Sequence, residues 1–217
     1  MTEDARPVQD RRIARSRRAL RSALFTLMEA RGYDALTVAD ITDRADVSRG
    51  TFYAHYQDKE DLLTDALEDL IHGLATQVHP LGATDLASGV DQTSVLFLDA
   101  GRRRQLYTAL LGSQGPAIAV VRVRRHLAAV MEANTTRQLV ESSGSTLPAG
   151  FLASHAAGAL LGQLIWWLEH DCPIPSAEMG PLFARLTTPG VLQVLGLPGA
   201  GTDVIEADSS PPGRTAG

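Results

Sequence analysis

The stretch from Thr37 to Lys59, TVADITDRADVSRGTFYAHYQDK, decides how this chain folds. Thr37 stands where a helix N-cap is expected, and Asp40 follows at the capping-box position three residues later. Apolar residues recur at helical spacing as far as Ala45, so this first helix should have one buried face. Ser48 is then placed to cap a second short helix, which the sequence predicts over residues 49–56.

The turn between these two helices is only a few residues long. Asp46 is predicted to adopt the left-handed conformation, which Asp tolerates better than most residues. Val47 should fill the angle between the helices, and Asp58 should cap a third helix that begins at Lys59. Two helices joined by so short a turn form a helix-turn-helix motif, whose second helix has the size needed to enter a DNA major groove.

This stretch also resembles the DNA-binding signature of the TetR/AcrR repressors. The matching residues are Thr37-Val38, Ala45-x-Val47-Ser48, Gly50-Thr51-Phe52-Tyr53, His55-Tyr56 and Asp58-Lys59, and their order and spacing fit from about Leu20 to Leu67. Two positions depart from the pattern: Asp46, where the family usually has Gly, and Ala54, where some relatives carry a bulky aromatic residue. The resemblance implies an all-α protein, with an N-terminal three-helix DNA-binding domain and a C-terminal helical domain for ligand binding and dimerisation.

Composition is that of an ordinary globular protein. The 217 residues are 44% hydrophobic and 21% charged. The sequence shows no secretory signal, and no apolar run stands out as a membrane-spanning segment, so we expect a cytoplasmic protein that does not enter a membrane. The single cysteine, Cys172, excludes an internal disulfide. The net charge is −5, but six arginines and no acidic residue lie between Arg11 and Arg21, so this end could still meet a phosphate backbone.

Helical periodicity continues to about Leu197 and divides the chain into four parts. We expect a disordered arm over residues 1–10, the DNA-binding domain over 11–58, a regulatory and dimerisation domain over 59–197 and a disordered tail over 198–217. A connecting helix, 59–79, should join the two domains. Helices are predicted over residues 11–31 (with Ile13 facing inward), 86–100, 102–111, 116–140, 151–169 and 176–186, the last capped by Ser176.

The family resemblance assigns DNA contacts to the helix-turn-helix and to the preceding helix. Arg49 can place two donors on guanine, whereas the hydroxyl of Tyr53 and the ring of His55 are better suited to phosphates. Lys59, at a helix N-terminus, is also expected to bind a phosphate. For every one of these side chains the alternative is an ordinary surface role. The complete predicted set is Arg11, Arg15, Arg18, Thr37, Val38, Ser48, Arg49, Gly50, Thr51, Tyr53, His55 and Lys59.

The C-terminal region carries two weaker predictions. A small-residue face in the most apolar helix suggests close approach of two subunits, and the resemblance implies a four-helix dimer interface. The residues predicted for it are Ala153, Ala157, Leu160, Leu161, Leu164, Trp167 and Phe183. An apolar ligand pocket is predicted from Phe97, Tyr107, His126, Met131, Phe151, His155 and Trp166, for which plain core packing is the alternative.

No motif for catalysis, nucleotide binding or metal binding is present, so we expect neither an enzyme nor a cofactor. The sequence therefore predicts a homodimeric transcriptional regulator, a repressor released from a palindromic operator by a small hydrophobic ligand. Its partners would be double-stranded DNA, a second copy of itself and a small-molecule effector. The alternative is a DNA-bound interaction protein whose C-terminal domain recruits a protein partner.

Overall fold

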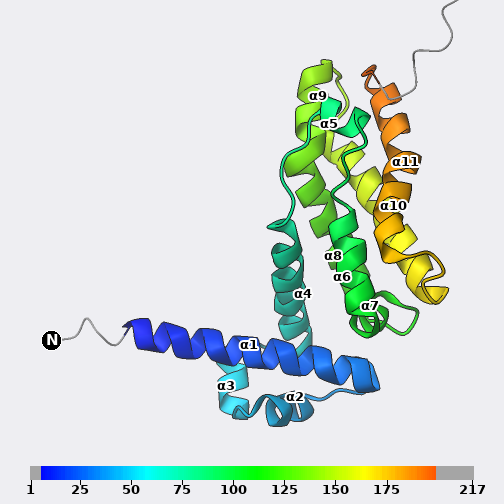
Figure 1. Cartoon of the computed structure of the whole chain (residues 1–217). Helices are drawn as coiled ribbons and strands as arrows, with labels where there is room; N and C mark the ends of the chain where they lie inside the picture. The colour runs from blue at the N-terminus through cyan, green and yellow to red at the C-terminus, as the bar shows by residue number, and fades with distance from the viewer. Residues whose placement is uncertain (1–5, 199–217) are drawn as a thin grey trace, which may run out of the picture.

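The computed structural model describes residues 6–198, and within this range the chain forms helices and no strand (Figure 1). The N-terminal domain consists of α1 (Arg6–Arg31), α2 (Val38–Ala45) and α3 (Arg49–Tyr53), and α4 (Lys59–Ala75) leads out of it. α1 lies across α2 and α3, and α4 rises steeply from it towards the second domain (Figure 1).

The local signals of the helix-turn-helix are confirmed. Thr37 and Asp40 form a reciprocal capping box, in which Asp40 N–H donates to Thr37 Oγ1 (3.2 Å) and Thr37 N–H donates to Asp40 Oδ2 (2.9 Å). Asp46 adopts the left-handed conformation at φ 54°, and Ser48 Oγ accepts the N–H of Thr51 at 3.0 Å. Each cap satisfies a backbone group that the short helices would otherwise leave unpaired.

Several boundaries differ from the sequence prediction. α1 begins at Arg6, so residues 6–10 are helical rather than disordered, while residues 1–5 and 199–217 lie outside the described range. Ile13 is 38% exposed instead of inward, because α1 extends past the domain at this end (Figure 1). α3 ends at Tyr53, and hydrogen-bonded turns lead on to Tyr56. α4 ends at Ala75, four residues earlier than the predicted 79.

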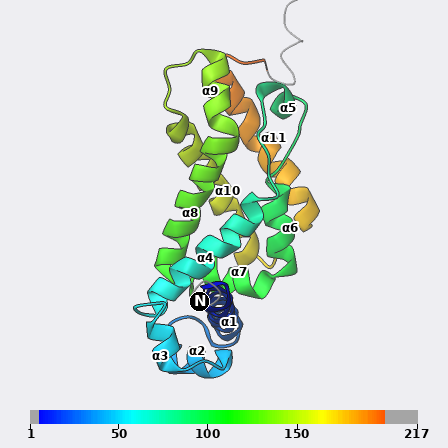
Figure 2. The same cartoon turned by 90° about the vertical axis from the view of Figure 1, so that its left-hand side faces the viewer.

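The second domain is a bundle of helices (Figure 2). Its elements are α5 (Ala83–Ala87), α6 (Ser94–Arg102), α7 (Arg104–Leu111), α8 (Ala117–Met131), a π-helical turn (Glu132–Thr136), α9 (Arg137–Ser143), α10 (Ala149–Glu169) and α11 (Ser176–Val194). α10 packs along α8, α11 packs along α6, and α4 packs against α8. α8, the π-helical turn and α9 follow one another directly and end at Ser143, three residues beyond the predicted 140.

The helix predicted over residues 86–100 is wrong, because the chain forms α5 and α6 with a loop between them. Gly89 has a φ of +80°, which ends α5. Asp91 then accepts the N–H groups of Thr93 (2.8 Å) and Ser94 (3.2 Å) and so starts α6. These local bonds outweigh the apolar periodicity that runs through the loop.

The last helix also differs from its prediction. Ser176 is its first helical residue rather than a side-chain cap, and the helix continues past 186 to Val194. Pro189 lies inside it, and its ring removes one backbone hydrogen bond. Pro189 and Arg185 are both exposed, so water can satisfy the carbonyl group that loses its partner.

α10 is long and apolar enough, by length and composition alone, to cross a membrane, which the sequence prediction overlooked. Its apolar residues have another explanation in this fold, because eight of them are buried in the helical bundle: Leu152, Ala153, Ala157, Leu160, Leu161, Leu164, Trp167 and Leu168. A central helix of a globular domain passes the same length and composition test.

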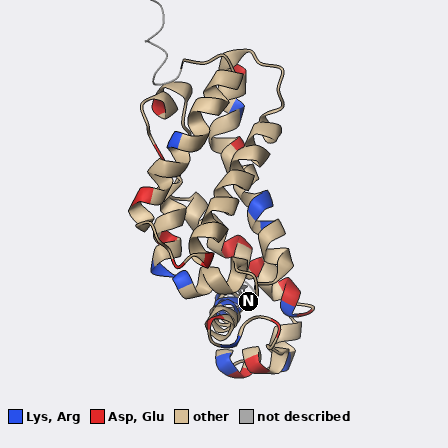
Figure 3. Cartoon of the chain, turned by 90° about the vertical axis from the view of Figure 1, so that its right-hand side faces the viewer, with Lys and Arg blue, Asp and Glu red and all other residues tan. Residues whose placement is uncertain are grey.

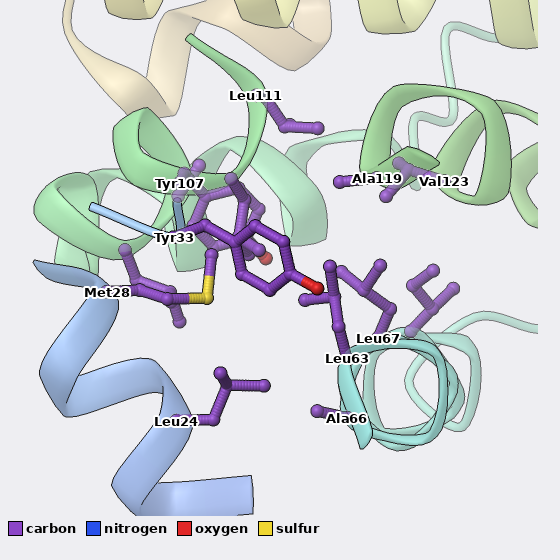
Figure 4. Packing of buried hydrophobic residues seen from close by; sticks show 14 of the residues in the cluster. Leu24, Met28, Tyr33, Leu63, Ala66, Leu67, Tyr107, Leu111, Ala119 and Val123 are labelled. Atoms are coloured by element: carbon purple, nitrogen blue, oxygen red, sulfur yellow. The ribbon is translucent and has the colours of Figure 1, made fainter. Parts of the chain in front are cut away.

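The two domains share one hydrophobic core. Tyr33, which follows α1, inserts its ring between Met28 of α1, Leu63 of α4 and Tyr107 of α7 (Figure 4). Leu111 of α7 and Val123 of α8 continue the same cluster. The DNA-binding domain is therefore packed against the base of the second domain rather than held by a flexible linker.

Candidate functional site

The recognition helix α3 is anchored by one residue and exposes its neighbours. Phe52 is fully buried, whereas Arg49 and Gly50 are exposed and the Tyr53 side chain is 60% exposed. The rings of Phe52 and Tyr53 meet edge to face at 5.3 Å, which fixes the direction of Tyr53. Thr51 pairs its hydroxyl with that of Ser48 at 2.9 Å. This leaves Arg49 and Tyr53 as the longest free side chains on the outer face.

The arginines of α1 fall into two groups. Arg11, Arg15 and Arg18 are exposed and share one face of the helix, as predicted, and basic residues mark this helix in Figure 3. Arg17 and Arg21 face the other way and bind Asp65 of α4. The first group, like the exposed Arg12, is free to meet a phosphate backbone, a distinction that composition alone could not make.

Lys59 does not fit its predicted role as a phosphate ligand. Its ammonium group donates to the carbonyl oxygens of Tyr33 (3.2 Å), Asp34 (3.4 Å) and Leu36 (3.1 Å). It also lies 4.4 Å from the centre of the Tyr33 ring, a cation–π contact. Because an ammonium group has three donors, these carbonyls use all of them. In this structure Lys59 fastens the start of α4 to the loop after α1.

Tyr56 is buried and belongs to a polar network that joins α1, the helix-turn-helix and α4. Its hydroxyl donates to Asp65 Oδ2 at 2.6 Å and accepts from Arg17 Nε at 3.3 Å. Arg21 bridges Asp65 (3.4 Å) and Asp69 (3.0 Å). Burial, and then the bond to Asp65, raise the pKa of Tyr56 to about 12. The network holds the recognition motif and the first turns of α4 together as one unit.

The second domain contains an apolar cavity of about 190 Å³. Its walls come from every helix between α4 and α11, the π-helical turn included, and they include Leu67, Leu74, Leu110, Val123, Leu160 and Phe183. Tyr107 and Met131 line this cavity, as predicted. The Tyr107 hydroxyl is engaged elsewhere, because it donates to Asp99 at 2.7 Å, and burial raises its pKa.

The other five residues predicted for the pocket do not line this cavity. Phe97 is fully buried beside it, with its ring edge to face against Trp167 at 6.1 Å, and His126 is half-buried on α8. Phe151, His155 and Trp166 lie exposed on the outer surface of α10. Aromatic residue type indicated an apolar environment but could not tell a cavity wall from an exterior face.

The predicted dimer-interface residues are also placed differently. Ala153, Ala157, Leu160, Leu161, Leu164, Trp167 and Phe183 are each 5% exposed or less within a single chain. The small residues of α10 allow close approach, but in this fold the helix that approaches is α8. The apolar side chains left exposed on α10 and α11 are Phe151 (62%), Trp166 (46%), Leu186 (72%) and Val194 (63%). Trp166 stacks on His170, with ring centres 4.5 Å apart.

In the described part of the chain, no cluster of three or more His, Cys, Asp or Glu side chains has an arrangement suited to a metal ion. The thiol of Cys172 is partly covered, and burial raises its pKa. A raised pKa keeps a thiol protonated and poorly nucleophilic.

The capped helix-turn-helix, its exposed recognition helix and the adjoining arginines define a DNA-binding transcriptional regulator. Comparison with known families gives the same result over both domains. Residues 20–66 match the family model of bacterial regulatory proteins of the tetR family, and residues 92–189 match a model of a transcriptional regulator C-terminal region. The chain belongs to the TetR family of transcriptional regulators.

Individual relatives are similar in the motif or in the fold. A 60-residue segment is 43% identical to the uncharacterised HTH-type transcriptional regulator YxbF of Bacillus subtilis, but it spans only 16% of that protein and 27% of this chain. A TetR transcriptional regulator from Streptococcus agalactiae has the same fold at 24% identity, with a TM-score of 0.60 over 83% of this chain and 97% of that one. The dihydroxyacetone kinase operon activator DhaS also has this fold, at 16% identity and a TM-score of 0.60, over 81% of this chain and 96% of that one.

Proposed function

We propose that this protein is a cytoplasmic, homodimeric repressor that binds a palindromic operator and is released from it by a small, hydrophobic ligand. The observation that carries the proposal is that one helix, α4, serves both functions. Leu67, Leu70, Ile71 and Leu74 of α4 line the cavity. Asp65, on the preceding turn of the same helix, holds the recognition motif through Tyr56.

Release would follow from a tilt of α4. A ligand that fills the cavity presses on the second half of α4, whereas Lys59 and Asp65 keep its first half fixed to the helix-turn-helix. The motif would therefore turn with the helix. In a dimer this changes the distance between two recognition helices, which must match operator half-sites about one DNA turn apart. A ligand shifts the equilibrium only by the difference between its affinities for the two arrangements.

The dimer follows from how little DNA one recognition helix can read. A single short helix contacts too few base pairs to select one site in a genome, so two copies should act together on a palindrome. The exposed apolar residues of α10 and α11, namely Phe151, Trp166, Leu186 and Val194, are the face proposed for the partner. They replace the buried residues that the sequence suggested, because large apolar side chains left exposed on one chain can be covered by a partner.

Recruitment of a protein partner by the second domain was the alternative function. The cavity favours a small molecule, because its lining is overwhelmingly apolar and comes from helices that surround it, as is typical of small-molecule sites. The proposed activity is regulatory and requires no catalytic group.

The test begins with the operator. Binding sites of the full-length protein would be mapped across the genome of its source organism, and the strongest site would be used in a fluorescence-anisotropy assay. We expect a few palindromic sites, two protomers per site and release by a compound that also binds the free protein. Many scattered non-palindromic sites, or one protomer per site, would contradict the proposal and favour the protein-recruiting alternative.

A further inference from the structure

We propose that the cavity binds an uncharged ligand of about eight to ten non-hydrogen atoms, apolar along most of its length and with one neutral hydrogen-bonding group at one end. This inference names the ligand class for the cavity of the proposed function and rests on it. The charges, the free polar groups and the volume of the cavity each restrict the ligand.

The cavity offers no counterion to an anionic ligand. No Lys or Arg is among the described residues that line it, and its titratable residues are Asp91, Tyr107 and the exposed His79. On the neighbouring helices, Arg103 binds Asp99, Arg124, Arg125 and Arg185 are exposed, and half-buried Arg122 is not among the lining residues. A carboxylate or phosphate placed among these leucines would lose its hydration without gaining a counterion, which is costly.

A cationic ligand has no free counterion either. Asp91 carries the only carboxylate among the lining residues, and it already accepts four hydrogen bonds. Thr93 supplies its N–H (2.8 Å) and its hydroxyl (2.5 Å), and Ser94 supplies its N–H (3.2 Å) and its hydroxyl. An ionised carboxylate has about four acceptor positions, so all of them are used to hold the start of α6.

Neutral hydrogen-bonding groups are available, and they gather towards one end. Thr135, Thr187 and Thr188 line the cavity, and within the described chain their hydroxyls make no hydrogen bond to other protein groups. The Asn134 amide donates to the Val130 carbonyl (2.9 Å), which leaves its oxygen able to accept. Leu139 follows Thr135 by four residues, and Val191 follows Thr188 by three. Leu139 and Val191 belong to one hydrophobic cluster, which brings these polar groups to the same end.

At this end of the cavity the backbone forms a π-helical turn instead of a regular α-helix. Asn134 and Thr135 lie on the π-helical turn that interrupts the run from α8 to α9, and such turns often occur at functional sites. The carbonyl of Asn134 accepts the N–H of Leu81 at 2.8 Å, which ties the segment after α4 to the turn. A ligand held here would contact the turn at its polar end and α4 along its apolar length.

The size follows from the volume. A 150 Å³ apolar cavity accommodates benzene, so about 190 Å³ suits a ligand of about eight to ten non-hydrogen atoms. Three compounds of this size, 1-octanol, octanoate and octylamine, share one chain and differ in the charge of the head group. They form a matched set of probes.

The experiment measures binding of the three probes to the full-length protein, without DNA, by isothermal titration calorimetry at pH 8, where an ordinary imidazole is uncharged. We expect 1-octanol to bind at least tenfold more tightly than octanoate and octylamine. Thr135→Val together with Thr187→Val should weaken octanol about two- to tenfold by removing hydrogen-bonding groups. Equal or tighter binding of octanoate or octylamine, or no binding of any probe, would overturn the inference.

Two variants locate the binding in the cavity. Ala156→Leu adds three carbons inside it and should abolish octanol binding, whereas Ala129→Leu adds the same volume on the exposed side of α8 and should not change it. Circular dichroism would verify that both variants are folded. Octanol binding that Ala156→Leu leaves intact would place the probe elsewhere and refute the assignment.

Operator release is then measured separately. Octanol that binds in the cavity but does not release DNA would contradict the proposed function and leave the ligand class standing. Release by octanoate in preference to octanol would support ligand-controlled repression and overturn the inference of a neutral ligand.

Discussion

The hydroxyl of Tyr56 donates a 2.6 Å hydrogen bond to the carboxylate of Asp65, and this bond joins the end of the helix-turn-helix to the connecting helix. Arg17 and Arg21 bind the same carboxylate, whose side chain is 17% exposed. One acidic residue on α4 thus holds three groups of the DNA-binding domain. The orientation of the recognition helix relative to the second domain depends on it.

Asp65→Asn should lower the free energy of unfolding by about 1–3 kcal/mol, because it leaves two arginines and a buried hydroxyl with a weaker partner. Asp69→Asn is the matched control. Asp69 lies on α4 like Asp65 and binds Arg21 of α1, but its side chain is 60% exposed. Its loss should therefore cost less than about 1 kcal/mol. Urea denaturation measures both, and equal effects of the two substitutions would show that Asp65 is an ordinary surface ion pair.

Arg49→Ala should weaken operator binding by about 1–3 kcal/mol and relax the preference at one base pair in each half-site. The reason is the position of Arg49, exposed at the start of α3 next to the buried anchor Phe52. Arg185→Ala, on the distant helix α11, is the control. Titration of a set of operator variants distinguishes the outcomes, since an equal loss on operator and random DNA would assign Arg49 to a phosphate.

Arg15→Ala should affect DNA binding, whereas Lys59→Ala should affect the stability of the fold. Arg15 is exposed on α1, so its removal should weaken binding to all DNA sequences and reduce the salt slope by about one unit. Lys59 uses its ammonium group on three carbonyls, so its removal should lower stability by about 1–3 kcal/mol. Its effect on the salt slope should be small. A folded Lys59→Ala protein with wild-type stability and a reduced slope would restore Lys59 as a phosphate ligand.

Trp166→Glu should convert the proposed dimer into a folded monomer, because Trp166 is 46% exposed on one chain and lies on the face proposed for the partner. Ala157→Glu is the contrasting variant. Its site is fully buried within the subunit, so an unpaired charge there should unfold the protein. Sedimentation velocity gives the oligomeric state and circular dichroism the fold. A Trp166→Glu protein that remains a dimer would move the interface elsewhere.

The capping box of α2 should respond to acid. Bonds from the Thr37 hydroxyl and then from its backbone N–H, together with Arg31, lower the pKa of Asp40 to about 2. A folded-state pKa below the unfolded value, about 3.9, stabilises the protein above that value, and the contribution is lost as the pH falls towards 2. The stability difference between wild type and Asp40→Asn should therefore be full at pH 7 and shrink between pH 4 and 2. Asp43→Asn, on the exposed side of α2, should show no such change, and an acid-independent effect of Asp40→Asn would contradict the cap's role.

The structure of the first domain could be predicted from the sequence more closely than that of the second, for a physical reason. The helix-turn-helix could be predicted closely because its signals are local. Thr37, Ser48 and Asp58 bond to N–H groups two or three residues away, and the left-handed turn at Asp46 depends on a single residue. In the second domain the same reasoning failed at Gly89 and Pro189, where helical periodicity was a poor guide to helix ends.

The sequence by itself determined the helical class, the DNA-reading motif and the exposed arginines of α1, since caps and periodicity act within a few residues. Tertiary structure decided which face of α10 is buried, because that depends on whether α8 or a second subunit approaches it. It also decided the roles of Lys59 and Asp65, whose partners Tyr33 and Arg17 lie 26 and 48 residues away in the chain. The cavity was likewise decided by tertiary structure, because its walls come from all the helices between α4 and α11, whose side chains meet only in the folded protein.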